Sequence, residues 1–280
     1  MNRILKLVFA VSSLTIATGL TVLALALPSL AHAGANQVVS RNYPWSSDHL
    51  TLDVDANVSY HPAPVWQVTI TAPERVLEQL VVGNGRIAAK EHGCFSLVPF
   101  CIGFGSDSHH AVNVAIAGPA LRRVTLDSSG RVDLVGLNQD RLTVRINGSG
   151  AVSGSGTVHD SIFEIGGSGS ITLDGLNQKR LTARISGSGT VAGSGSTRDL
   201  EADISGSGNI RLARLSDENA RVSVSGSGDV DIAPANSVSV SVSGAGDVHL
   251  HSHPQSLVMH VSGSGGVTER PAGPSAAAAH

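Results

Sequence analysis

The sequence predicts an all-β fold, a single-stranded right-handed parallel β-helix (a β-solenoid) with coils of about 19–20 residues. Three observations lead to this prediction. A Gly-x-Gly turn recurs at a nearly constant spacing, aliphatic residues flank every turn, and apolar and polar residues alternate on both sides of it. Regular repeats of this length are typical of coils that bury their apolar faces against one another.

The Gly-x-Gly turn sets the period of the repeat. The second glycines are Gly150, Gly169, Gly189, Gly208, Gly228, Gly246 and Gly265, so successive turns are 19, 20, 19, 20, 18 and 19 residues apart. The first glycines are Gly148, Gly167, Gly187, Gly206, Gly226, Gly244 and Gly263. Glycine is expected because a sharp corner favours φ > 0, which glycine reaches without a Cβ penalty. The middle residue is serine in most turns, which predicts a row of hydroxyls along the corner.

Aliphatic residues on both sides of each turn exclude a flexible linker. The residue two positions before and the residue two positions after each turn are always Val, Ile or Leu. In "ARVSVSGSGDVDIAP", Val222 and Val224 are expected to face inward, whereas Ser223 and Ser225 face outward. A linker rich in Gly and Ser has no reason to keep this alternation. Each repeat is therefore read as strand, turn and strand.

Two looser members of the repeat are expected to end at Gly85 and Gly130, 45 residues apart. That interval equals two periods and a short insertion, which contains both cysteines in "CFSLVPFC". Because six residues separate Cys94 from Cys101, a structural disulfide is favoured over a redox pair. Residues 90–110 are accordingly predicted to be a disulfide-stapled insertion.

A longer period of 39 residues is superimposed on the short one, because "GLNQDRLTVRINGSGAVSGSG" recurs as "GLNQKRLTARISGSGTVAGSG". Duplication of a two-coil unit is the simplest origin of this pattern. It also predicts a column of outward side chains in which opposite charges alternate from coil to coil. The column reads Arg145, Glu164, Arg184, Asp203, Ser223, Ser241 and His260.

The ends of the chain indicate export. Residues 1–33 read as a signal peptide, with Arg3 and Lys6, an apolar run and an "AHA" cleavage site at Ala31–Ala33. An uncleaved anchor is the alternative; after cleavage no membrane span is expected. The β-helical domain is predicted for residues 34–270, with an N-terminal cap and first coil at 38–80, regular coils at 121–268 and a disordered tail at 271–280. The periplasm or the cell surface of a bacterium is the expected location.

The motifs "INGSGAV", "ISGSGTV", "VSGAGDV" and "VNVAIAGPALRRVTLDSSGRVDL" resemble the bacterial family called putative auto-transporter adhesin, head GIN domain. The resemblance covers roughly residues 38–270. It implies an exported β-helical domain without an established enzymatic role and with an adhesin-like label. The cysteine-containing insertion and the His-rich C-terminal end depart from the family pattern.

One cluster of residues is a candidate metal site. If the aliphatic residues around them face inward, acidic and histidine side chains on two neighbouring coils face outward together. These residues are Asp229, Asp231, Asp247, His249, His251 and His253. Their oxygen atoms suit Ca²⁺ and their imidazoles suit Zn²⁺ or Cu²⁺, whereas a solvated face is the alternative. No other cofactor is expected.

Composition narrows the possible functions. Without Arg3 and Lys6, 17 basic residues stand against 22 acidic ones, so a nucleic-acid partner is not expected. The leading interpretation is a non-enzymatic, adhesin-like module of the cell envelope with a protein or glycan partner and no catalytic residue. The alternative is an envelope polysaccharide hydrolase or lyase using Asp229, Asp231, Asp247 and His249. An uncapped last coil, near Leu257 to Val267, would allow a homodimer through the solenoid ends.

Overall fold

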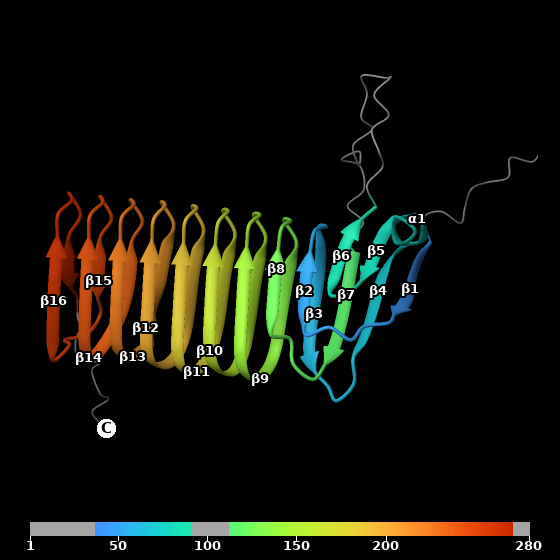
Figure 1. The fold of residues 1–280 in the computed structure, drawn as a ribbon, viewed down its shortest axis with the longest axis horizontal. Coiled ribbons are helices and arrows are strands. Elements are labelled where there is room, and N and C mark those ends of the chain that lie inside the picture. The colour runs from blue at the N-terminus through green and yellow to red at the C-terminus, as the bar shows by residue number, and fades with distance from the viewer. Residues whose placement is uncertain (1–36, 91–111, 271–280) are drawn as a thin grey trace, which may run out of the picture. The chain divides into compact units, whose positions relative to one another are not determined.

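The structure, a computed structural model, describes residues 37–90 and 112–270. In these residues one ladder of 17 strands winds into a β-solenoid (Figure 1), which confirms the predicted fold class. The predicted signal peptide, the disulfide between Cys94 and Cys101, and the tail lie outside the described residues. Among the helices of the described part of the chain, none is long and apolar enough to span a membrane.

The first part of the solenoid mixes antiparallel and parallel pairing. Its elements are β1 (Val38–Tyr43), β2 (His49–Leu52), β3 (Ala56–Pro62), β4 (Gln67–Pro73), α1 (Glu74–Leu77), β5 (Leu80–Gly83), β6 (Arg86–Ala89), β7 (Val112–Gly118) and β8 (Arg123–Leu126). β4 pairs antiparallel with both β1 and β7, and β3 pairs parallel with β7 and with the first regular coil. Tyr60 is buried there, and its hydroxyl donates to the Gly118 carbonyl over 3.1 Å.

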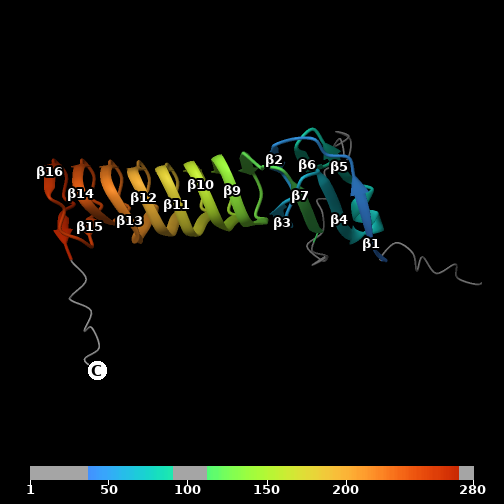
Figure 2. The same ribbon diagram turned by 90° about the horizontal axis from the view of Figure 1, so that it is seen from below.

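The regular coils follow, and each long strand is one coil. They are β9 (Arg131–Ile146), β10 (Ala151–Ile165), β11 (Ser170–Ile185), β12 (Thr190–Ile204), β13 (Asn209–Val224) and β14 (Val230–Val242), followed by β15 (Val248–Leu250), β16 (Ser256–Val261) and β17 (Val267–Glu269). Each coil pairs parallel with the next. The bend in each coil divides the ladder into two facing walls, its two sheets, and Figure 2 shows these bends from below.

Columns of aliphatic side chains fill the space between the two sheets. Ile146, Ile165 and Ile185 are register partners on successive coils, and each is buried. Burial of such a side chain contributes about 1.5–3 kcal/mol. The outward column is also in register as predicted, because Glu164 pairs with Arg145 on one side and Arg184 on the other.

The structure corrects the reason for glycine in the repeated turns. The glycines of the Gly-x-Gly turns do not have left-handed φ values; a Cβ on Gly187 would instead overlap the carbonyl oxygen of Gly167 in the preceding coil. Close backbone approach therefore selects glycine. Positive φ occurs at the opposite corner of the coils, at Gly136, Gly156 and Gly175, and again at Gly195.

The structure also corrects the prediction that the segment ending at Gly85 is a member of the repeat. β5 and β6 pair antiparallel, so the Asn84-Gly85 segment is a β-hairpin turn rather than a coil corner. Asn84 has a φ of 49° and Gly85 has a φ of 77°. The Asn-Gly pair favours a tight hairpin because both residues tolerate left-handed backbone.

Candidate functional site

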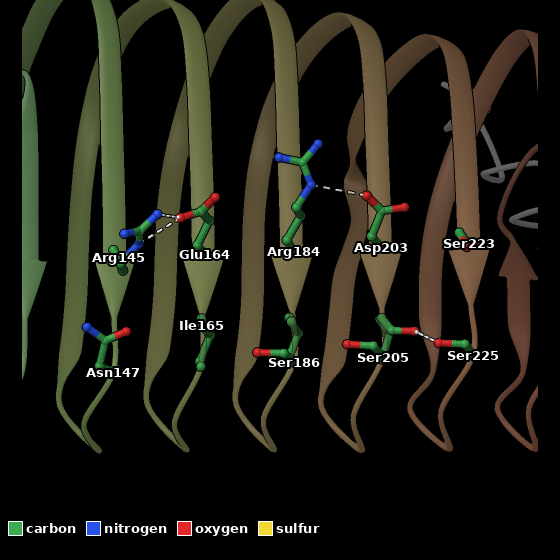
Figure 3. A pocket seen from close by; sticks show the side chains of 13 residues that line it. Arg145, Asn147, Glu164, Ile165, Arg184, Ser186, Asp203, Ser205, Ser223 and Ser225 are labelled. Carbon is green, nitrogen blue, oxygen red and sulfur yellow. Dashed lines mark hydrogen bonds and ion pairs between the residues drawn. The ribbon is translucent and has the colours of Figure 1, made fainter.

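A groove crosses the outer face of one sheet, next to the Gly-x-Gly turns (Figure 3). One bank, the charged row, consists of Arg145, Glu164, Arg184, Asp203 and Ser223. The other bank, the amide and hydroxyl row, consists of Asn147, Gly166, Ser186, Ser205 and Ser225. In each coil the two rows are two residues apart. The side chain of the residue between them faces inward, so the space between the two banks stays open. The groove has a volume of about 420 Å³.

Ion pairs fix the long side chains of the charged row. The Arg145 Nε donates to Glu164 Oε2 over 2.8 Å. The Arg184 guanidinium donates to Glu201 Oε1 over 3.0 Å and to Asp203 Oδ2 over 3.3 Å. Partial burial acts to lower the pKa of Arg184, but the hydrogen bonds and charges of Glu201 and Asp203 outweigh it and raise that pKa. The hydrogen bonds therefore orient both guanidinium groups along the charged row.

The amide and hydroxyl row offers groups that a ligand can use. Asn147 Nδ2 donates to Asp127 Oδ1 over 2.6 Å, and Ser225 Oγ donates to the Ile204 carbonyl over 3.4 Å. Within residues 37–90 and 112–270, the hydroxyls of Ser186 and Ser205 make no hydrogen bond, although both residues are exposed. Gly166 has no side chain, which widens the groove on that coil. Hydroxyls and an amide thus recur along the bank at about 4.8 Å.

The predicted Asp and His residues lie on the opposite sheet from the groove. Asp231 and His249 are register partners on neighbouring coils. The backbone N–H of Asp247 donates to Asp229 Oδ1 over 3.0 Å. The next coil repeats this contact, because the Gly266 N–H donates to Asp247 Oδ1 over 2.7 Å. The carboxylates of Asp229 and Asp247 therefore bind backbone N–H groups of the following coil.

Each histidine of this patch has a separate partner. His251 Nε2 lies 2.9 Å from Asp231 Oδ1, His249 Nδ1 lies 2.9 Å from Thr268 Oγ1, and His253 Nδ1 lies 2.8 Å from Glu269 Oε2. In the part of the chain that the structure describes, no three His, Cys, Asp or Glu side chains are close enough to hold one metal ion. Metal binding by these residues stays a prediction.

Comparison with known proteins identifies the family of the chain. The family model described as "Putative auto-transporter adhesin, head GIN domain" matches residues 48–254. The chain belongs to this family. No curated protein matches the sequence.

Solved structures share the fold of this head GIN domain. A putative lipid binding protein from Parabacteroides distasonis ATCC 8503 is 19% identical, with a TM-score of 0.71 over 84% of this chain and 98% of that chain. A putative adhesin from the same organism is 18% identical, with a TM-score of 0.69 over 85% and 98% of the two chains. A putative adhesin from Parabacteroides merdae ATCC 43184 is 17% identical, with a TM-score of 0.70 over 85% and 98%. At these identities the likeness shows the fold alone.

The head GIN domain also has a buried polar column that the sequence did not reveal. Gln178, Thr197 and Asp217 are register partners on three successive coils, and all three are buried. Both polar atoms of Gln178 and the Oδ2 of Asp217 make no hydrogen bond with any described residue. Asp217 Oδ1 accepts from the Ala233 N–H over 3.3 Å, and burial raises the pKa of Asp217 to about 7.

Proposed function

We propose that the chain is an exported, non-enzymatic, adhesin-like module of the bacterial envelope that binds a linear neutral polysaccharide along the groove. The groove carries this proposal, because the charged row presents a polar side chain on every coil and the amide and hydroxyl row does so on every coil except that of Gly166. The family name, which refers to adhesins, and the predicted signal peptide support an exported interaction module.

The chemistry of the two banks favours a neutral glycan. An extended polysaccharide repeats its hydroxyl groups along its length, as the groove repeats its polar groups at the coil spacing of about 4.8 Å. Guanidinium, carboxylate and amide groups are planar and can each bond two neighbouring hydroxyls of a sugar. Arg145 and Arg184 are balanced by Glu164 and Asp203, so the groove has no excess charge that would select an acidic polymer.

The same ion pairs support binding rather than hydrolysis. Glycoside hydrolysis requires one carboxyl group that donates a proton and a second carboxylate that acts as nucleophile or base. Glu164 and Asp203 instead accept hydrogen bonds from Arg145 and Arg184, so their carboxyl oxygens are already engaged in ion pairs. The hydrolase or lyase alternative at Asp229, Asp231, Asp247 and His249 gains no support from the comparisons, whose names are adhesin and lipid binding protein.

The groove is tested by a double variant and a matched control. Arg145→Ala with Arg184→Ala is expected to weaken binding to immobilised neutral polysaccharides at least tenfold, since a hydrogen bond to a charged group contributes about 1.5–3 kcal/mol. Arg141→Ala with Arg180→Ala removes the same charges from the same two coils, four residues earlier and outside the groove. Equal loss in both variants, or binding of acidic polysaccharides only, would contradict the proposal.

A further inference from the structure

The C-terminal end of the solenoid exposes its core. Met259 and Val261 on β16 are register partners of Val240 and Val242 on β14. Val240 is 2% exposed and Val242 is 0% exposed, whereas Met259 is 54% exposed and Val261 is 43% exposed. These two columns of core side chains are buried at β14 and exposed to solvent at β16, because no described coil follows β16.

Exposed apolar side chains gather at this end. Of the seven large apolar side chains that are exposed in the described residues, three belong to β16: Val258, Met259 and Val261. Among those residues β16 pairs with β14 alone, so its other edge presents free backbone N–H and C=O groups. A free edge beside an open core is a site for the addition of another strand.

The other end of the solenoid is closed differently. β1 pairs antiparallel with β4, and α1 directly follows β4. Apolar residues of this end are half-buried against the core, namely Val39, Tyr43, Val76, Leu80 and Val82. Because the first strands are antiparallel, this end does not offer the parallel edge that would continue the coils of a second molecule.

We propose that the β16 edges of two copies of this chain pair in a symmetric, end-to-end dimer. A second copy fits because the outward residues of β16 are Ser256, Val258 and His260, so two identical edges bring no Asp, Glu, Lys or Arg side chains together. The inward residues of both copies then join into one apolar core. Because the same edge of both chains forms this contact, the contact is closed and assembly stops at two chains instead of forming a fibre.

The second sheet at this end restricts the contact to β16. Glu269 on β17 is the register partner of the buried Leu250, so a charged residue occupies a core column. An inward-facing charge on an edge strand discourages the addition of another strand. Glu269 is held by His253, and the dimer contact is therefore centred on Met259. Two linked grooves would also bind a long polymer more tightly than one groove does.

The dimer is tested by light scattering on the full chain over a range of concentrations. The expected result is twice the mass of one chain for the unchanged protein and a single-chain mass for Met259→Asp. Val135→Asp is the matched control, because Val135 is 53% exposed on a coil far from the end. It is expected to stay dimeric. Circular dichroism melting confirms that both variants are folded.

Two results would overturn the dimer. One is a single-chain mass for the unchanged protein at every concentration. The other is a single chain that becomes a dimer when the chain is shortened to end at Arg270, which would identify residues 271–280 as the segment that covers β16. If a dimer forms but Met259→Asp and Val135→Asp behave alike, the contact lies elsewhere and the proposal is also wrong.

Discussion

The two edges of the solenoid, where the chain passes between the sheets, follow different rules. At the turn edge, formed by the Gly-x-Gly turns, each coil repeats the same backbone contact with the one before. The Ser188 N–H donates to the Gly167 carbonyl over 3.0 Å, and the Ala245 N–H donates to the Gly226 carbonyl over 2.9 Å. Because alanine makes the same contact as serine, the side chain of the middle residue is not needed for it.

At the bend edge, the opposite corner of the coils, the register shifts. Shifts fall between Ser155 and Thr157 and between Leu173 and Leu176, and similar shifts occur in the neighbouring pairs. Left-handed glycines and the buried polar column lie at this corner as well. Coils of different length are therefore accommodated at the bend edge, whereas the turn edge keeps one geometry. The repeat is therefore strict where backbones touch and variable where side chains fill the space.

The largest expected effect tests the turn edge. Gly187→Ala is expected to lower the free energy of unfolding by more than about 3 kcal/mol, because its Cβ overlaps the Gly167 carbonyl oxygen and backbone must move. Gly175→Ala at the bend edge has open space and a φ of 66°, so its cost should be about 1–2 kcal/mol. Urea unfolding measures both. Equal losses would show that the two edges do not differ.

The second prediction concerns the buried carboxyl of Asp217 at the bend edge. Its pKa is about 7 in the folded chain and 3.8 as the ordinary value. Between these values the folded chain binds more protons than the unfolded chain, so stability falls as the pH rises from about 4 to about 7 and then becomes constant. Asp217→Asn, which keeps an oxygen for the Ala233 N–H, should raise the free energy of unfolding at pH 8 by up to about 4 kcal/mol.

Melting temperatures at pH 4.5 and pH 8 check this prediction. The gain from Asp217→Asn should be large at pH 8 and small at pH 4.5. Asp174→Asn, an exposed carboxylate on β11, is the control and should show no such difference. A variant that is destabilised at pH 8 would mean that the charge of Asp217 is compensated in the folded protein.

The smallest effect is expected for Asp247→Asn, just after the turn edge. Asparagine already fills this column at Asn209, whose Oδ1 accepts from the Asp229 N–H over 3.1 Å. The variant should therefore change the free energy of unfolding by less than about 0.5 kcal/mol. The same melts with Ca²⁺, Zn²⁺ and Cu²⁺ test the metal prediction. A rise for one ion that is lost in Asp247→Asn with His249→Ala would establish a metal site, and no rise would exclude one for these ions.

Much of the solenoid could be predicted from the sequence, because its signals are local and repeated. The spacing of the turns and the alternation of Val222 and Val224 with serine set the register, and the register placed Glu164 between Arg145 and Arg184. The reason for glycine could not be predicted, since left-handed φ and close backbone approach select the same residue. At Gly85, which has a φ of 77°, the same residue type marks a hairpin turn instead of a coil corner.

The candidate sites were harder to predict, because they depend on how deeply each side chain is buried. The sequence predicts the charged row only as a column of outward side chains, and the structure shows that it is one bank of a groove beside Ser186 and Ser205. Asp217 lies in the polar run "LSDEN", which resembles a surface loop. Register shifts at the bend edge make alternation uncertain there, so the burial of Asp217 could not be read from its neighbours.

The alternating charges have a consequence for how the chain can change its length in evolution. Loss of the single coil that carries Glu164 would place Arg145 beside Arg184, and loss of the next coil would place Glu164 beside Asp203. Like charges at the coil spacing repel, whereas removal or gain of two coils keeps each arginine beside a carboxylate. Within this charged stretch, related chains should therefore differ by an even number of coils. Selection would then act on whether the number of coils is even or odd.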